Sequence, residues 1–273
     1  MRLKMRTKLS SLVHSGQYLI SHRQLLWRVT RSEMTARYAG SIFGIGWAVL
    51  TPLLILVIYS VVYLVIFRVR VPGLSSVDYV LFIFSGLVPF LMTSEALSTG
   101  VGSVVANKSV LSNTVFPIDL APAKAVLLSQ VTMGVGMIVI LAAAFSTGHL
   151  FWTALLLPVI WGLHMFALIG VVWMLSLINL VFRDLQNLVS LAVMILMIAS
   201  PIAYTPEMVP DSLRLFIAVN PLAYFVTTYQ QILIFGQWPG LLNSIVLVVM
   251  SVTLFALGGY FFARSKRALI DYV

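Results

Sequence analysis

Long runs of apolar residues constrain this chain more than any other feature of its sequence. Five of them cover 42–67, 79–97, 124–146, 152–182 and 239–262. A helix needs about 20 apolar residues to cross the hydrocarbon core of a bilayer. The chain is 60% hydrophobic and 9% charged, whereas about 25% of the residues in a soluble domain are charged. We therefore expect an all-α polytopic membrane protein, with residues 1–273 forming a single transmembrane domain.

Two further stretches have to be assigned before the spans can be counted. Residues 187–204 form a shorter apolar run that ends in proline-rich sequence, and we predict that it is also a span. Residues 211–235 are interrupted at Asn220-Pro221, which leaves pieces too short to cross the membrane. Proline also moves the residue before it away from helical geometry.

The distribution of positive charge decides how this interrupted stretch is arranged. Eight of the 17 Lys and Arg residues precede residue 38, and cytoplasmic segments of membrane proteins carry an excess of these residues. A seventh span at 211–235 would put the basic tail around Arg264 on the outer side. We therefore predict six transmembrane helices, two cytoplasmic termini, and a re-entrant helical hairpin at 211–235 before the last span.

Two segments on the cytoplasmic side are predicted to be helical without spanning the membrane. Residues 18–38 mix apolar residues with arginines, as in an amphipathic helix at the membrane interface, and Glu33 and Arg37 have the i,i+4 spacing of a helical ion pair. Residues 98–116 form a short, mildly amphipathic segment between the second and third spans. The junction "RYAGSIFGIGW" (37–47) contains no proline or polar loop, so we expect a rigid connection, with its glycines allowing close helix packing.

The sequence offers neither a catalytic nor a metal site. It has no cysteine, and its four histidines are scattered without ligand spacing. Residues 102–109 resemble a phosphate loop, but Asn107 replaces the glycine that lets the backbone wrap the phosphates, and a membrane span precedes the segment where a strand is required. We expect no nucleotide site in this chain. The net charge of +9 is typical of a membrane surface here, so we expect no nucleic acid partner.

Polar and aromatic residues inside the spans leave two interpretations open. Glu95 is the one carboxylate within a predicted span; it has either a functional role or simple contact with water and headgroups. His164 is expected to form a hydrogen bond between packed helices. Tyr59, Tyr63 and Phe67 recur every four residues and share one helix face. They either make hydrogen bonds between helices or line a path whose rings and hydroxyls suit sugars.

Taken in order, several motifs are similar to a known family. They are "RYAGSIFGIGWAVLTPLL", "FSGLVPFLMTSEALSTGVGSVVANKSVL", "VFPIDLAPAKAV", "NLVFRDLQNLV", "SPIAYTPEMVP" and "LFIAVNPLAYFVTTYQQILIFGQWP". Over residues 15–267 the chain resembles the permease subunit of type-2 ABC exporters of polysaccharides, which export lipid-linked O-antigen, teichoic acid or capsule.

The resemblance implies a location and partners that the residues alone do not give. It implies a multi-pass protein of the cell inner (cytoplasmic) membrane that pairs with a second copy to form a channel. Two separate ATP-binding-cassette ATPase subunits would bind below and hold ATP-Mg, so the permease itself would need no cofactor and would not be an enzyme. The substrate would be a polyprenyl-linked polysaccharide, taken up next to membrane lipids.

The resemblance also implies roles for individual residues. ATPase coupling would fall to the segment 98–116 and to the turn after the fourth span (Val101, Val104, Val105, Lys108, Leu111, Arg183 and Asp184). The interface helix would meet lipid headgroups through Arg28, Arg31, Arg37 and Tyr38. The channel would be lined by Trp47, Tyr59, Tyr63 and Phe67, and an outer gate would be formed by Tyr204, Asn220, Pro221 and Tyr224.

The main alternative is an ion-coupled secondary transporter, or a flippase of a lipid-linked or small substrate. Such transporters also contain broken helices, but they usually carry ionisable groups near the middle of the membrane. Gln130, His164 and Asn179 are the polar residues this sequence offers there. A membrane-embedded transferase would need an acid/base pair at the interface, and none is apparent.

Overall fold

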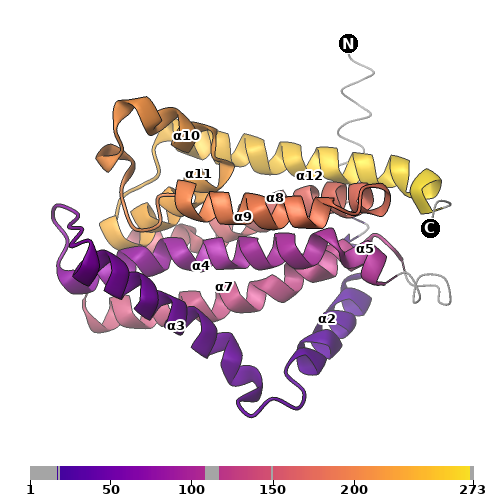
Figure 1. The fold of residues 1–273 in the computed structure, drawn as a ribbon, viewed down its shortest axis with the longest axis horizontal. Helices are drawn as coiled ribbons and strands as arrows, with labels where there is room; N and C mark the ends of the chain where they lie inside the picture. Colours follow the sequence, from indigo (N-terminus) through magenta and orange to yellow (C-terminus); the bar gives the residue numbers. More distant parts are fainter. Residues whose placement is uncertain (1–16, 18, 108–116, 149, 271–273) are drawn as a thin grey trace.

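The computed structural model describes residues 17, 19–107, 117–148 and 150–270, with side chains up to residue 265. Every regular element in these ranges is a helix. Five of the helices are long and apolar enough to cross a membrane, namely Gly44–Ile66, Ser76–Val101, Leu120–Ser146, Trp152–Val181 and Leu241–Ser265. The last four lie side by side in a bundle, whereas the helix that contains Gly44–Ile66 slants away from it toward the amphipathic helix α2 (Arg23–Arg37) (Figure 1). The expected all-α membrane architecture is therefore observed.

Helix α4 (Ser76–Val101) lies at the centre of the bundle. In its most apolar stretch 78% of the residues are buried by other helices, against 6% for Gly44–Ile66, which contains α3 (Trp47–Ser60). Helix α4 packs against α7 (Leu120–Ser146) and α8 (Leu157–Val181). Its start is fixed by a capping box, in which the Ser75 hydroxyl accepts from the Asp78 N–H and the Asp78 carboxylate accepts from the Ser75 N–H.

Helix α8 crosses α12 (Leu241–Ile270) in close contact through two glycines. A Cβ atom on Gly258 would lie 2.1 Å from the Gly170 carbonyl oxygen, and one on Gly170 would lie 2.2 Å from the Leu254 carbonyl oxygen. Both distances are far below van der Waals contact, so the two backbones touch where they cross. This is small-residue packing of the kind expected at 40–46, but it occurs elsewhere in the chain.

The sixth predicted span is shorter in the structure than in the prediction. Helix α9 runs over Leu185–Ala199, 15 residues, whereas 187–204 was expected. It ends because Pro201 requires an extended residue before it, and Ser200 has ψ 139°. A straight helix of this length rises about 23 Å, less than the roughly 30 Å hydrocarbon core.

The stretch 211–235 forms a broken helical pair, as the proline predicted. Helix α10 (Arg214–Val219) and helix α11 (Pro221–Gln230) meet at Asn220, and a short π-helical segment continues to Phe235. The pair lies at the end of the bundle opposite α5 (Ser103–Ala106) and the end of α12 (Figure 1).

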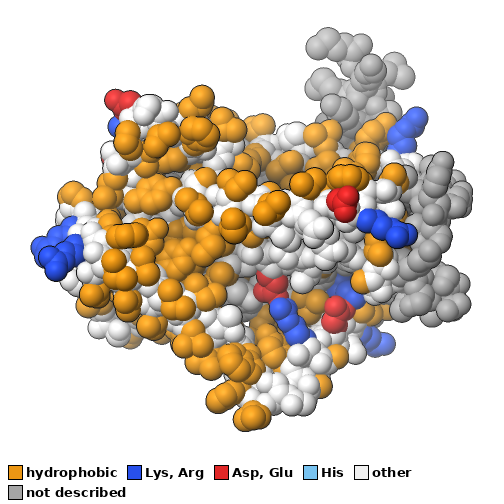
Figure 2. Space-filling view, in the orientation of Figure 1, with side chains coloured by type: hydrophobic (Ala, Val, Ile, Leu, Met, Phe, Trp, Pro, Cys, Tyr) orange, Lys and Arg blue, Asp and Glu red, His pale blue; other side chains and the backbone are white. Residues whose placement is uncertain are grey.

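Apolar side chains cover the visible face over α3, α9 and α10, whereas charged side chains gather at the ends and near α2 (Figure 2).

Candidate functional site

Two ion pairs hold α2 against the bundle. Arg37 pairs with Glu95 of α4, and Glu33 pairs with Lys124 of α7. The second oxygen of Glu95 accepts a hydrogen bond of 2.6 Å from the Thr132 hydroxyl, which also belongs to α7. Glu33 and Arg37, which were expected to pair with each other, each have an ion-pair partner on a different span. The negative charge of Glu33 also favours the charged form of Arg37, as their i,i+4 spacing predicted.

These contacts argue against one of the two interpretations of Glu95, simple contact with water and headgroups. Its side chain is 15% exposed and joins three helices, so it is a structural link rather than a solvated carboxylate. Burial disfavours the charge of Arg37, but the hydrogen bond and negative charge of Glu95 outweigh this and raise the pKa of Arg37 above its usual value. The guanidinium therefore remains protonated at neutral pH.

The other predicted headgroup residues lie on the open side of α2. Arg28 and Arg31 line a shallow cavity of about 540 Å³ together with Ser32 and Thr35. The opposite side of the helix is covered, since Leu26 and Thr30 are buried. Tyr38 follows the last turn, where the guanidinium carbon of Arg37 lies 6.0 Å from the centre of its ring.

The junction between α2 and the first span contains a turn, whereas a connection without one was expected. Residues 38–43 are non-helical. Gly40 has φ +76° and Gly44 has φ +51°, which L-residues with side chains rarely adopt. A Cβ atom on either glycine would meet no neighbour within 4 Å. These glycines therefore shape the turn and make no close contact with another described helix of this chain.

The described part of the predicted coupling segment is partly buried. Val101 and Val104 are 0% and 2% exposed, and Val104 packs into the main core. The expectation that Val104 offers an apolar contact to a partner was therefore wrong, because α5 turns this side chain inward. Val105 is 41% exposed and does face outward. Lys108 and Leu111 lie outside the described residues.

The second predicted coupling element lies near the first. Arg183 and Asp184 form the exposed turn between α8 and α9. A Cβ atom on Gly102 would lie 3.5 Å from the Gln186 side chain, which follows this turn. The structure thus brings α5 and the Arg183-Asp184 turn together at one end of the bundle, although 76 or more residues separate them in the sequence.

The predicted aromatic face is continuous at the other end of the first span. The rings of Tyr59 and Tyr63 stack with centroids 5.8 Å apart, and Tyr63 meets Phe67 edge-on at 5.8 Å. The ladder crosses a π-helical segment, Val61–Ile66, a feature often found at functional sites. Trp47 is at the opposite end of α3, 38% exposed and in edge-on contact with Phe43 at 5.5 Å.

The predicted gate residues are held by an extensive hydrogen-bond network. The Asn220 side chain accepts from the Leu222 N–H at 2.9 Å, which caps α11, and donates to the Ser200 hydroxyl at 3.0 Å. Pro221 occupies the first position of α11, where its missing N–H costs nothing. The Tyr204 hydroxyl donates to the Ile198 carbonyl at 3.2 Å. The broken pair is therefore tied to the loop that follows α9.

Two residues of this network were not identified from the sequence. Gln230 donates to the carbonyls of Pro201 and Ile202, and Tyr79 of α4 donates to the Ala203 carbonyl at 2.6 Å. Their acceptors are backbone atoms far away in the sequence, so no residue pattern marks them.

Nearby, His164 bonds to Thr93 at 3.0 Å and stacks on Phe225 with ring centroids 4.0 Å apart, as expected for a residue that joins packed helices.

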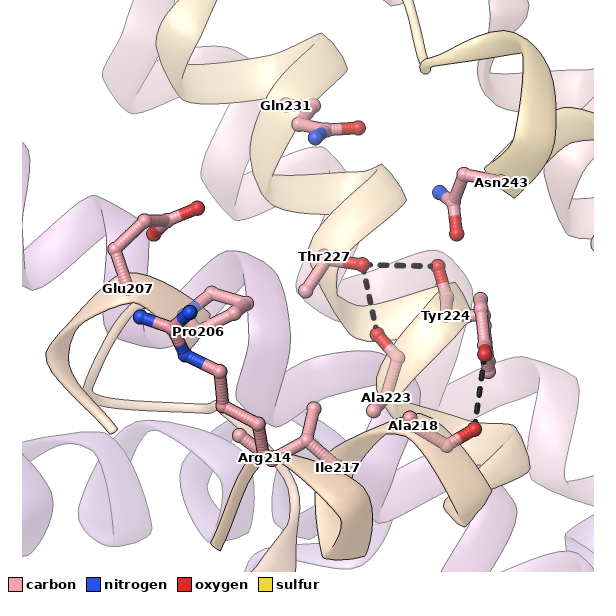
Figure 3. Close-up of a pocket in the computed structure, with 10 residues that line it drawn as sticks. All are labelled: Pro206, Glu207, Arg214, Ile217, Ala218, Ala223, Tyr224, Thr227, Gln231 and Asn243. Carbon is pink, nitrogen blue, oxygen red and sulfur yellow. Dashed lines mark hydrogen bonds between the residues drawn. The ribbon is translucent and has the colours of Figure 1, made fainter. Parts of the chain in front are cut away.

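A pocket of about 420 Å³, with both apolar and polar walls, opens beside the broken pair (Figure 3). Its walls come from the loop after α9, from α10, from α11 with its π-helical extension, and from the start of α12. The ten lining residues are Pro206, Glu207, Arg214, Ile217, Ala218, Ala223, Tyr224, Thr227, Gln231 and Asn243. Of the predicted gate residues, it includes Tyr224, whose hydroxyl donates to the Ala218 carbonyl at 2.9 Å.

The sequence of the chain is similar to those of several known export proteins. The chain is 29% identical to the O-antigen export system permease protein RfbA of Klebsiella pneumoniae, over 85% of this chain and 87% of the relative. It is 27% identical to the protein of the same name from Myxococcus xanthus, over 93% and 97%. It is 24% identical to the polysialic acid transport protein KpsM of Escherichia coli, over 71% and 75%. Residues 24–234, which run from α2 through the broken helical pair, match the family described as ABC-2 type transporter, and the chain belongs to that family.

Proposed function

We propose that this chain is the membrane-spanning permease of an ATP-driven exporter that moves a lipid-linked polysaccharide out of the cytoplasm. The observation that carries the proposal is the family membership together with relatives, similar over most of both chains, that are named as O-antigen export permeases. The observed helix bundle also supports the exporter proposal, because five long apolar helices with a broken helical pair at one end suit a transport protein.

In this proposal the chain has six spans in the inner membrane and both termini in the cytoplasm. Helix α9 is the short sixth span, and 211–235 enters and leaves on the outer face. Such a short helix is accommodated by local thinning of the bilayer or by a partner. A second copy of the chain supplies that partner, since α3 and α9 both present largely uncovered apolar sides.

Energy comes from two separate ATPase subunits, which hold the ATP and magnesium. We infer that these subunits dock at the end that carries α5 and the Arg183-Asp184 turn. The ion pairs Arg37–Glu95 and Glu33–Lys124 then carry movement of α2 to two spans at once. This route replaces the rigid junction, because residues 38–43 form a turn.

An ion-coupled transporter finds less support. Such proteins use ionisable side chains near the middle of the membrane. In this chain Glu95 is paired with Arg37 of the interface helix, which makes it a poor carrier of a coupling ion.

Reconstitution tests the proposal. The purified chain alone should not hydrolyse ATP. The chain with its cognate ATPase in liposomes should hydrolyse ATP and move lipid-linked polymer across the bilayer. Saturable ATP turnover by the isolated chain, or polymer movement driven by an ion gradient without ATP, would contradict it.

A further inference from the structure

We infer that the pocket beside the broken helical pair binds an uncharged segment of the exported glycan as it leaves the transporter. The inference rests on the proposed function and deepens it, because it gives the class of polymer that this exporter accepts. Its basis is the set of side chains that line the pocket and the position of the pocket at the end of the bundle opposite α5 (Figures 1 and 3).

The size of the pocket suits a small ligand. Its volume of about 420 Å³ falls within the range of about 300–1,000 Å³ that is typical of ligand sites. Four separate segments of chain converge on it, so it is built by the fold and not by one loop. The Tyr224 ring is fixed by the hydrogen bond of its hydroxyl to the Ala218 carbonyl, and an aromatic face of this kind packs against the C–H face of a sugar ring.

The hydrogen-bonding groups are those that recognise hydroxyls. The Thr227 hydroxyl donates its proton to its own helix, to the carbonyls of Ala223 at 2.8 Å and Tyr224 at 3.3 Å, which leaves its oxygen lone pairs as acceptors. The oxygen of the Gln231 amide is buried without a hydrogen-bond partner. Gln231 lines the pocket, and because the terminal torsion of glutamine is broad, its amide can turn toward a ligand there. A buried polar atom without a partner is costly, and a ligand hydroxyl would satisfy it.

Asn243 completes the polar wall from a different helix. Its amide nitrogen donates to the Thr228 hydroxyl at 2.6 Å, which leaves its carbonyl oxygen as an acceptor. Figure 3 shows Asn243 and Gln231 on either side of the open space above Thr227. Amides and hydroxyls both donate and accept hydrogen bonds, and a sugar hydroxyl does the same. The side chains of the pocket therefore match a glycan through uncharged hydrogen-bonding groups.

The charge of the wall argues against an anionic polymer. One acid, Glu207, and one base, Arg214, line the pocket, so its formal charge is zero. Arg214 is moreover paired with Asp211 at 2.9 Å. A site for phosphate or for repeated carboxylates would need unpaired arginines or lysines. A polymer with an acid on every repeat would instead meet Glu207 and Asp211.

Cysteine labelling gives a direct test, since the natural chain has no cysteine. Thr227→Cys places a single thiol in the pocket, and Ser146→Cys places one at the exposed end of α7, outside the pocket. Intact cells are treated with a membrane-impermeant maleimide while polymer synthesis is on or off. The labelling rate at residue 227 should fall by about threefold or more during export. A threefold fall means that glycan occupies the pocket for about two thirds of the time and leaves the thiol accessible for the remaining third. Labelling at residue 146 should not change.

The other outcomes separate this inference from the proposed function. If polymer reaches the surface normally and residue 227 labels equally fast in both conditions, or if both thiols slow alike, the pocket is not a glycan site and the exporter proposal stands. If no polymer crosses in cells that carry the natural chain and its ATPase, the exporter proposal fails. Ala218→Cys, also in the pocket, repeats the test if the Thr227 variant does not assemble. A recovered polymer with a charge on every repeat would overturn the assignment to an uncharged glycan.

Discussion

Arg37 in the last turn of α2 is paired with Glu95 near the end of the central helix α4, 58 residues further along the chain. Glu95 is also bonded to Thr132 of α7, so one carboxylate joins the interface helix to two spans. The pair therefore lies on a direct path between the membrane surface, where a partner ATPase would act, and the helices that would have to move.

Breaking this pair should weaken coupling more than folding. A partly exposed ion pair contributes about 1 kcal/mol or less, so Arg37→Gln should leave assembly nearly unchanged. Polymer exported per ATP hydrolysed should fall by about threefold to fivefold if the pair transmits movement, because about 1 kcal/mol corresponds to a factor of about five. Measurement of both rates in proteoliposomes gives this ratio.

The charge-swapped double variant Arg37→Glu with Glu95→Arg is the matched control. It restores an attractive pair and should recover much of the lost ratio. Arg31→Gln, an exposed arginine on the same helix, should have little effect. Equal loss in Arg31→Gln and Arg37→Gln would show that the overall charge of α2 matters and the pair does not.

The spans could be predicted from the sequence because their cause is local. Apolar length alone fixes helices at Gly44–Ile66 and Trp152–Val181 within about two residues of the predictions. Proline explains both the end of α9 and the break at Asn220. Residues whose partners are distant could not be predicted. No pattern in the sequence links Arg37 to Glu95 or Gln230 to Pro201, and the direction in which Val104 points depends on how α5 packs. The location of the site could thus be predicted in outline, but its contacts could not.

The crossing of α8 and α12 predicts a large difference between two glycines on one helix. Gly170→Ala forces a methyl group against the Leu254 carbonyl, whereas a Cβ atom on Gly162 meets nothing within 4 Å. Overpacking costs about 1–3 kcal/mol, and alanine favours a helix over glycine by about 1 kcal/mol. Gly170→Ala should therefore unfold at lower denaturant concentration in detergent, and Gly162→Ala should be neutral or slightly more stable. Equal stability of the two variants would contradict this packing.

The Asn220 cap predicts a graded series at the break between α10 and α11. Asn220→Ala removes both the bond to the Leu222 N–H and the bond to Ser200, and loss of a cap costs about 1 kcal/mol. Asn220→Asp keeps the acceptor for Leu222 and loses the donor to Ser200. Limited proteolysis of the purified protein should therefore cut near 220 fastest in the alanine variant, at an intermediate rate in the aspartate variant and slowest in the natural chain. Identical rates would mean that Asn220 does not hold the break.

The proposed topology predicts which introduced thiols can be reached from outside. Single cysteines at Thr147 and Val209 should react with an impermeant reagent in intact cells. Those at Asn107 and Ser265 should react only after the membrane is opened, because positive charge keeps both of these ends inside. If the thiol at 265 reacts from outside, 211–235 crosses the membrane completely and the re-entrant arrangement is wrong.

The orientation of α5 predicts opposite outcomes for two adjacent valines. Val104 is 2% exposed and packed into the core, whereas Val105 is 41% exposed. An aspartate at 104 buries an unpaired charge, which costs several kcal/mol, so Val104→Asp should reduce the amount of folded protein in the membrane. An aspartate at 105 faces out and leaves folding intact, since surface changes usually cost less than about 0.5 kcal/mol.

If α5 docks on the ATPase, however, Val105→Asp should weaken recovery of the complex by about tenfold or more, because contact residues at interface centres contribute about 2 kcal/mol. Gln237→Asp, an exposed position at the opposite end, is the control and should leave both folding and complex recovery unchanged. Co-purification of the ATPase with each variant, at matched levels of inserted protein, separates the two effects. Normal recovery and normal export in Val105→Asp would remove α5 from the docking surface, and the exposed turn at Arg183-Asp184 would then be the remaining contact at that end.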